Sequence, residues 1–177
     1  MFNSYHYKLS VPVSININET WNTERLSWYD CTHPELIAFL ESLGVSIRHA
    51  QRFYTPPYGN LPIHVDSHEA VGQAKLNYIV GGKGSVMNWF ELKPGKTMKT
   101  MVTNVGSKYL YADEEDVVKV HSAEIGYPSI INSGELHSIT NGPEPRVCYS
   151  FVLKYLDNDR NLNWQDASNM FEAYIDG

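Results

Sequence analysis

The chain has 177 residues and a mass of 20.2 kDa, and 42% of its residues are hydrophobic and 12% aromatic, which excludes an intrinsically disordered polymer. Its 14 Lys and Arg and 20 Asp and Glu give a net charge of -6, and it has no basic run to neutralise successive phosphates, so direct nucleic-acid binding is disfavoured. No segment approaches the ~18 consecutive apolar residues of a membrane-spanning helix, so no membrane partner is expected.

Length and cysteine content bound the organisation of the chain. One hydrophobic core commonly reaches this size, so residues 1–177 are expected to form a single domain. Cys31 and Cys148 lie far apart and lack C-x-x-C spacing, which argues against a disulfide framework. The N-terminus lacks the basic and apolar regions of an export signal. These features favour a reducing cytoplasm, and they leave the oligomeric state open.

The first predicted element is a helix over residues 33–43. Thr32 and Glu35 have capping-box spacing, leucines and an isoleucine recur at helical period, and Gly44 can end the helix. Short strands follow, in which β-branched and aromatic residues alternate with polar ones between Gly and Pro turns. The predicted strands cover 45–53, 63–65, 76–80, 86–92, 117–123, 128–132, 136–140 and 146–156.

A second helix is predicted after Asn163, its N-cap. Trp164, Ala167 and Phe171 begin an apolar stripe that continues to Ile175, so this helix should cover the outside of a sheet. A helix, roughly eight short strands and another helix form the pattern of a β-sandwich or barrel with helical buttresses. We therefore expect a mainly β fold, a double-stranded β-helix (jelly-roll, cupin-like) with flanking α-helices.

The stretch LPIHVDSHE, residues 61–69, concentrates metal-ligand types. Residues two apart on a strand share a face, so His64 and Asp66 should project together. His68 stands four residues from His64, the spacing of a zinc site on a helix, but Pro62 and the β-branched neighbours favour a strand. A solvated strand end is the alternative explanation of this stretch, so further ligands are required.

The segment from Tyr127 to Phe151 supplies two more candidates. It contains a short apolar strand, a turn at Gly134, His137 at the start of the next strand, another turn, and Arg146 opening a third strand. Taken singly, His137 fits a loop histidine bonded to backbone, and Arg146 fits a strand-end arginine that reaches solvent. The joint pattern with residues 64 and 66 favours a common site.

These four residues carry a resemblance to a known family. His64-x-Asp66, a gap of 71 residues to His137, and Arg146 nine positions later resemble the motif of the iron(II)- and 2-oxoglutarate-dependent oxygenases. The resemblance covers about residues 50–155, and the chain looks like a small, minimally decorated member. Such members include virally encoded proteins, for which the implied location is a host cytoplasm.

The resemblance implies a ligand set, a co-substrate and a reaction. Fe(II) would be held by His64, Asp66 and His137, the catalytic ligands, and 2-oxoglutarate would be anchored at its far carboxylate by Arg146. O2 and an unidentified substrate complete the implied reaction, in which 2-oxoglutarate yields succinate and CO2 while a C–H bond is hydroxylated. Asp66 stands where halogenating relatives carry a small residue, which favours hydroxylation.

One position departs from the family pattern. Relatives often carry a serine two residues after the arginine, whereas this chain has Cys148. The group that completes the co-substrate pocket is therefore open among Ser150, Asn77 and a tyrosine: Tyr54, Tyr58 or Tyr78.

Other features receive structural interpretations. Surface or cap positions are expected for four histidines, His6, His33, His49 and His121, and a solvated loop for 113–116. Residues 97–116 are a candidate for part of the substrate mouth. The aromatic residues are expected to pack in the core or on sheet faces: Trp89, Phe90, Tyr109, Tyr111 and Tyr149.

Two rival functions stay open at this point. One is a non-catalytic metal-binding module of the same fold, and the other is a cupin enzyme with different metal chemistry that has no need of Arg146. The sequence does not distinguish a peptidyl substrate from an amino acid, a nucleobase or a small metabolite.

Overall fold

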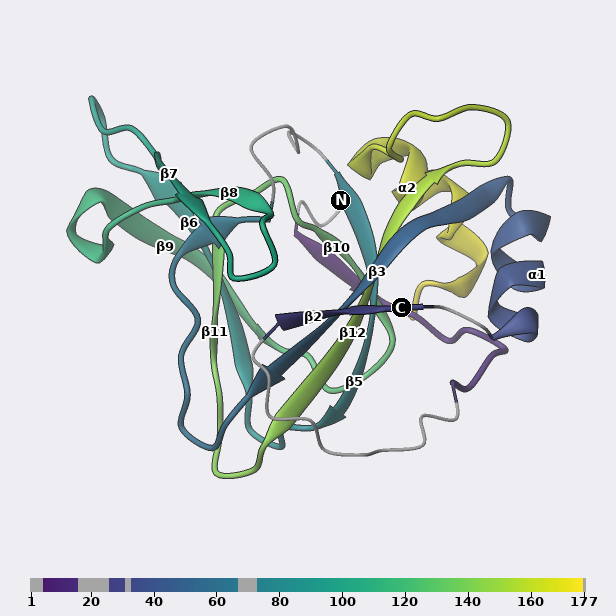
Figure 1. The fold of residues 1–177 in the computed structure, drawn as a ribbon, viewed down its shortest axis with the longest axis horizontal. Coiled ribbons are helices and arrows are strands. Elements are labelled where there is room, and N and C mark those ends of the chain that lie inside the picture. The colour runs from purple at the N-terminus through teal and green to yellow at the C-terminus, as the bar shows by residue number, and fades with distance from the viewer. Residues whose placement is uncertain (1–4, 16–25, 31–32, 67–72, 177) are drawn as a thin grey trace.

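The computed structural model describes residues 5–15, 26–30, 33–66 and 73–176. Two antiparallel sheets of six strands face one another, and two helices cover the outer face of one of them (Figure 1). The helix-covered sheet has the spatial order β1 (His6–Lys8), β10 (Ser129–Asn132), β5 (Ala74–Gly81), β12 (Arg146–Tyr155), β3 (Val45–Thr55) and β2 (Leu26–Tyr29). The open sheet has the order β7 (Lys99–Val102), β8 (Lys108–Tyr111), β4 (His64–Val65), β11 (His137–Thr140), β6 (Val86–Leu92) and β9 (Val117–Glu124).

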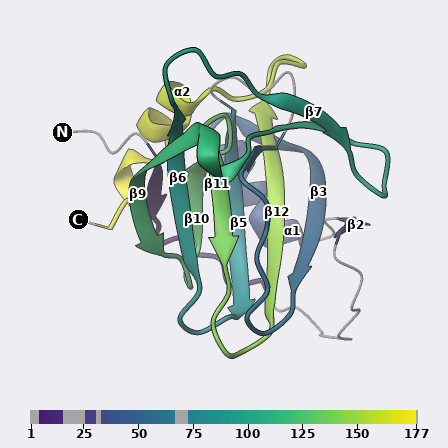
Figure 2. The same cartoon turned by 90° about the vertical axis from the view of Figure 1, so that its left-hand side faces the viewer.

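The strand order defines the fold. The four strands β3 to β6 alternate between the two sheets in chain order, and the four strands β9 to β12 do the same. Figure 2 shows the resulting sandwich, with β9, β6 and β11 in front of β10, β5 and β12. This alternation is the jelly-roll arrangement of a double-stranded β-helix. The predicted fold class is therefore confirmed.

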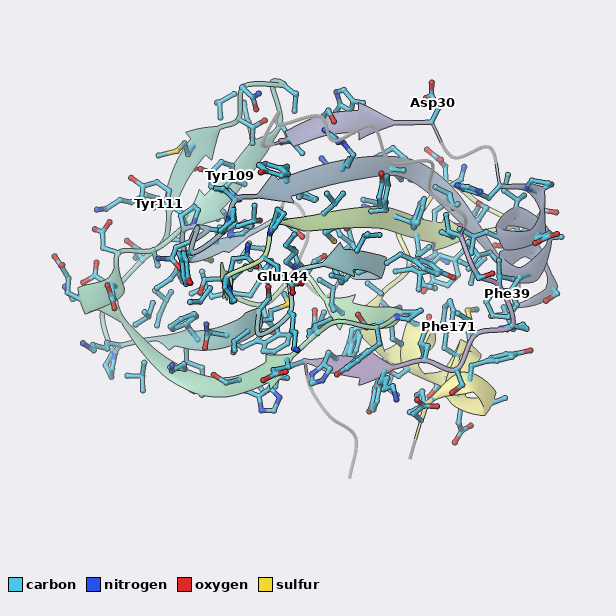
Figure 3. The ribbon with its side chains drawn as sticks, turned by 90° about the horizontal axis from the view of Figure 1, so that it is seen from below. Asp30, Phe39, Tyr109, Tyr111, Glu144 and Phe171 are labelled. Carbon is cyan, nitrogen blue, oxygen red and sulfur yellow. The ribbon has the colours of Figure 1, made fainter. Side chains whose placement is uncertain are left out.

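The helices pack on the outside of the helix-covered sheet. Helix α1 (Pro34–Ser42) and helix α2 (Trp164–Met170) bury Leu36, Leu40 and Phe171 against it. Phe39 and Phe171 meet edge-on at 6.3 Å between ring centroids, and both lie among the helices in Figure 3. Short 3-10 turns follow at η1 (Glu114–Asp116) and η2 (Glu172–Tyr174). No helix within the described ranges is long and apolar enough to cross a membrane.

The first helix prediction holds within a residue at each end, and the second holds at its start, but α2 ends at Met170 and the stripe expected to reach Ile175 continues in the separate turn η2. The side chain of Asn163 accepts a hydrogen bond from the backbone N–H of Asp166 at 2.8 Å, as an N-cap does. The N-cap of α1 is His33, which makes no side-chain capping bond, and Thr32 lies outside the described residues. A surface or cap position was predicted for His33, and the structure places it at the N-cap.

The prediction of a surface position is wrong for His6 and holds only in part for His121, which is half-buried. His6, on β1, is only 9% exposed, and its ring stacks on fully buried Trp89 at 5.2 Å. His121, on β9, lies 5.5 Å from His6 and 5.3 Å from Trp89 between ring centroids. β1 and β9 are edge strands of the two sheets, so the rings of His6, His121 and Trp89 pack in the seam, the space between these two edges. The sequence concealed this because β1 has only three residues and no distinct periodicity.

Candidate metal centre

Strand pairing brings the predicted ligands together. His64 on β4 and His137 on β11 are directly opposite in the register of the open sheet. Asp66 follows β4 on the same face as His64, as the two-residue strand period requires. One ligand atom from each of the three side chains lies within 4.8 Å of the other two. Residues separated by 71 positions thus form one cluster.

Backbone hydrogen bonds fix the orientation of both imidazoles. His64 Nδ1 lies 2.7 Å from the carbonyl oxygen of Pro62, and His137 Nδ1 lies 2.8 Å from that of Glu135. A carbonyl oxygen can only accept, so each Nδ1 carries the donated proton. The Nε2 atom of each ring then faces the carboxylate of Asp66. Metal-binding histidines commonly use this arrangement.

The three side chains of the cluster together favour the binding of a cation. Burial first, and then the neighbouring His64 imidazole, lower the pKa of His137 to about 4, so this ring is neutral near pH 7. Its Nε2 lies 3.8 Å from Asp66 Oδ2, and His64 Nε2 lies 3.2 Å from Asp66 Oδ1. Lone pairs and carboxylate oxygens repel unless a proton or a cation lies between them. Two imidazoles and one carboxylate fit a non-haem Fe(II) centre.

Lys75 completes the electrostatics of the cluster, and sequence reasoning missed it. Its ammonium lies on β5 of the opposite sheet, 2.9 Å from Asp66 Oδ2. Burial opposes ionisation of Asp66, but Lys75 and the two imidazoles outweigh this and hold the pKa of Asp66 well below its ordinary value. The sequence signal that could have identified Lys75 is a charged residue next to the largely apolar predicted strand 76–80.

Arg146 opens β12 and points into the interior between the sheets. It is 3% exposed, and its Nε atom has no hydrogen-bond partner. Gly82 makes room for it, because a Cβ at that position would lie 2.8 Å from Cβ and Cγ of Arg146. Gly82 also has a φ of 68°, a left-handed conformation that favours glycine. A buried guanidinium with an unused donor is a suitable partner for an anion.

A small cavity of about 30 Å³ connects Arg146 with the cluster. Its lining includes His64, Asp66 and His137 together with Arg146, Asn77, Cys148 and Ser150. Asn77 Oδ1 has no hydrogen-bond partner. Burial raises the pKa of the Cys148 thiol, against a smaller opposing effect of Arg146, so Cys148 stays protonated. The three predicted metal ligands, Arg146, Asn77 and Ser150 therefore border a single space, whereas Tyr54 does not.

Tyr54 is the exception, and its prediction as a co-substrate contact is wrong. On β3, Phe53 lines the cavity, so the next side chain along the strand must point to the other face. Tyr54 packs there against the core under the helices. Tyr78 also lies in that core, and Tyr58 is an exposed turn residue. None of the three tyrosines reaches the cavity.

A second cavity of about 320 Å³ reaches the cluster from the edge formed by β2 and β7. His64 and Asp66 form its floor, and apolar side chains such as Leu26, Phe53 and Val102 line its walls. Tyr109 on β8 meets the His64 ring edge-on at 5.7 Å. Part of the segment 97–116 thus borders this space, where a substrate mouth was predicted. Figure 3 labels Tyr109 and Tyr111 on this side of the molecule.

Two of the residues singled out in the sequence, His68 and Cys31, lie outside the described residues. His49 is half-buried, and its ring meets that of Trp28 edge-on. The acidic run 113–116 forms two ion pairs at the surface, Lys99 with Asp113 and Lys96 with Asp116.

Comparisons with known proteins give distant structural similarity only. No family model and no curated sequence matches the chain. It is similar to a cupin 2 domain-containing protein from Halorhodospira halophila, with 12% identity over 95% of this chain and 88% of that one and a TM-score of 0.33. It is also similar to the apo form of the non-heme monooxygenase ThoJ, with 15% identity, 75% and 58% coverage and a TM-score of 0.35.

A third similar structure is EvdO2 from Micromonospora carbonacea var. aurantiaca complexed with 2-oxoglutarate, with 12% identity, 70% and 59% coverage and a TM-score of 0.34. The chain spans less than two thirds of the length of ThoJ and EvdO2. At these identities and TM-scores no function is transferred, and the fold class rests on the strand order.

Proposed function

We propose that the chain is an Fe(II)- and 2-oxoglutarate-dependent oxygenase that converts 2-oxoglutarate to succinate and CO2 while hydroxylating a substrate C–H bond. One observation carries the proposal. The His64–Asp66–His137 cluster and the buried guanidinium of Arg146, with its unpartnered Nε, border the same interior cavity. A metal alone has no use for the arginine, whereas a metal-chelating dicarboxylate uses both.

The residues divide the work between them. His64, Asp66 and His137 would hold the metal on one face, and the backbone bonds of both Nδ1 atoms keep the rings in place. Arg146 would pair with the far carboxylate of the co-substrate, and Ser150 or Asn77 would supply a further hydrogen bond. When bound, iron and 2-oxoglutarate would supply the electrons that activate dioxygen, which is the oxidant of the substrate C–H bond. The apolar walls of the larger cavity would keep water from the reacting C–H bond.

The cavity must enlarge before 2-oxoglutarate can bind. Its volume of about 30 Å³ is roughly a tenth of the 320 Å³ of the larger cavity beside it. Met87 lines it, and methionine side chains adapt readily to neighbouring groups. Phe53 and Leu61 border both cavities, so rotation of these side chains would join the two spaces. The substrate, a peptidyl side chain or a small molecule, would then enter beside β7 and β8.

Succinate formation tests the proposal. The protein is incubated with Fe(II), 2-oxoglutarate, ascorbate and air, and succinate is measured with and without candidate substrates. We expect slow substrate-independent turnover in the wild type and a loss of about 100-fold or more in Arg146→Met at low co-substrate, because a charged carboxylate partner is removed. Glu144→Gln, an exposed change in the adjoining turn, is the matched control. Equal turnover in both variants would contradict the proposal.

The small cavity favours one alternative, a metal-binding module without turnover. Such a protein would need only the three-residue cluster and no space for a dicarboxylate. It would bind Fe(II) or Co2+ through His64 and His137 but show no change in metal spectrum with 2-oxoglutarate. A 2-oxoglutarate titration of the metal-loaded protein therefore separates the two functions.

A further inference from the structure

Lys75 is a charged side chain buried in the interior between the sheets. It is 2% exposed, and it neighbours Ile131 and Val152 in the register of the helix-covered sheet. Its Nζ lies 2.9 Å from Asp66 Oδ2 and 3.3 Å from Gln51 Oε1. Burying an ammonium is costly, and neither neighbour in the sheet offers it a polar group. The ion pair with Asp66 is therefore the feature that needs an explanation.

The two oxygens of Asp66 have different neighbours. Oδ2 binds Lys75 and also faces Nε2 of His137 at 3.8 Å, while Oδ1 faces Nε2 of His64 at 3.2 Å. The lysine lies behind the carboxylate, because it borders neither of the two cavities that Asp66 borders. A ligand in either cavity would therefore reach the metal position without touching Lys75. Its influence on such a ligand must come through orientation and charge.

Charge is the larger of these two influences. Asp66 contributes one negative charge and Lys75 one positive charge, so the protein groups at the cluster sum to zero while both imidazoles are neutral. A divalent cation added there keeps its full charge of two. Without the lysine the same centre would carry a charge of one. Charges separated by a few ångströms interact strongly where water is excluded.

We propose that Lys75 is a positioning residue that neutralises Asp66, so that a bound divalent metal stays dicationic and prefers anionic over neutral ligands. The inference rests on the metal-binding part of the proposed function and adds a residue to it. Its chemical consequence is selection: carboxylate, enolate and other anionic ligands gain affinity at the metal, and neutral nitrogen ligands do not.

Ligand binding to the Co2+-loaded protein tests this without turnover. Azide is an anionic metal ligand, and imidazole is a neutral one. The dissociation constant of each is measured from the visible spectrum at saturating Co2+ for the wild type, Lys75→Met, Lys75→Gln and Lys75→Arg. Glutamine can still donate a hydrogen bond to Asp66 but carries no charge, whereas arginine keeps the charge.

We expect azide to bind about 100-fold more weakly to Lys75→Met and Lys75→Gln, the scale expected for losing one charge about 6 Å away at an effective dielectric constant of about 20. Imidazole affinity should stay within about twofold in both, and Lys75→Arg should resemble the wild type for both ligands. Equal weakening of azide and imidazole would show a structural role and overturn the proposal. So would wild-type azide affinity in Lys75→Gln.

Metal binding itself separates the failure of this inference from that of the proposed function. If the wild type takes up no Co2+, both are overturned. If Lys75→Arg binds Co2+ and the two uncharged variants do not, the lysine is needed for folding or for ligand geometry, and the charge proposal is wrong. Removing a positive charge should not by itself weaken the binding of a cation.

Discussion

The two faces of the helix-covered sheet are built from alternate residues of the same strands, yet they bury opposite kinds of side chain. On β12, Val147, Tyr149 and Phe151 enter the apolar core under the helices. Arg146, Cys148 and Ser150 border the cavity on the other face. The same alternation on β5 sends Leu76 outward and Asn77 inward. Both faces are closed to water, so the difference does not come from exposure.

The comparison teaches how to interpret polar residues in buried strands. A helix-covered face needs only shape and hydrophobicity, and each buried apolar side chain contributes favourably. A buried arginine, lysine or asparagine costs free energy unless it is paired. Such residues gathered on one face of β5 and β12 therefore mark a site that stability alone would not produce. The two faces should respond to mutation in opposite ways.

The largest effect is expected from His137→Ala, on β11 of the open sheet, whose side chain borders the same cavity as the interior face of β12. Two remaining ligands cannot hold the metal's geometry, so Co2+ or Fe(II) binding should fall below detection. The free energy of unfolding of the metal-free protein should change far less, because the imidazole carries no apolar packing between the helices. Calorimetric metal titration and chemical denaturation measure the two quantities. Retained metal binding would assign the ligands to other residues.

On the helix side, Phe151→Ala should act in the reverse manner. This fully buried ring packs among the core residues, and its loss should lower the free energy of unfolding by about 3–5 kcal/mol. The protein that remains folded should bind metal with wild-type affinity. Urea unfolding checks the first quantity, and metal titration at low denaturant checks the second. A parallel loss of metal affinity would mean that the two faces are coupled.

The seam between the sheets should make stability depend on pH. Burial, and then His121, lower the pKa of His6 to about 4, below its ordinary value of 6.5. The unfolded chain binds a proton more readily in this interval, so stability is lost as the pH falls from 6.5 toward 4. His6→Phe should remove on the order of 1 kcal/mol of this loss at about pH 5, after allowance for solvent screening. Urea unfolding of both proteins across this range provides the measurement, and an identical pH dependence would contradict the assignment.

The smallest effect is expected at Cys148, which stands beside Arg146. Cys148→Ser replaces a weak donor by a hydroxyl that can bond the far carboxylate, so 2-oxoglutarate should bind about threefold more tightly. Cys148→Ala, which offers no donor, should show no gain. Anaerobic titration of the Fe(II) protein measures both. Equal affinities in the two variants would remove Cys148 from the co-substrate pocket.

The sequence predicted the eight strands of the double-stranded β-helix because each carries β-branched or aromatic residues and turn signals separate them. Strand 86–92 was predicted with its observed bounds. The strands β1, β2, β7 and β8 were missed because each has only three or four residues, and β7 is fully exposed. Length is not the whole reason, because β4, β10 and β11 are as short and were predicted; β1, β2 and β7 are in addition edge strands, paired on one side only.

The site was predicted less evenly. His64, Asp66 and His137 follow from residue type and spacing, and the structure brings them within ligand distance of one another. Tyr54 was misplaced by one register position, which the upstream turns do not fix. The role of Lys75 was not predicted, because its partner Asp66 lies nine residues away and follows a strand of the other sheet, and no local sequence pattern encodes such a contact.

The most direct test is the visible spectrum of the anaerobic protein with Fe(II) and 2-oxoglutarate. A weak charge-transfer band should appear in the wild type and in Glu144→Gln, vanish in His137→Ala, and require far more co-substrate in Arg146→Met. A wild-type protein that binds Fe(II) but shows no band, or an unchanged titration in Arg146→Met, would contradict the claim that one cavity holds both metal and co-substrate.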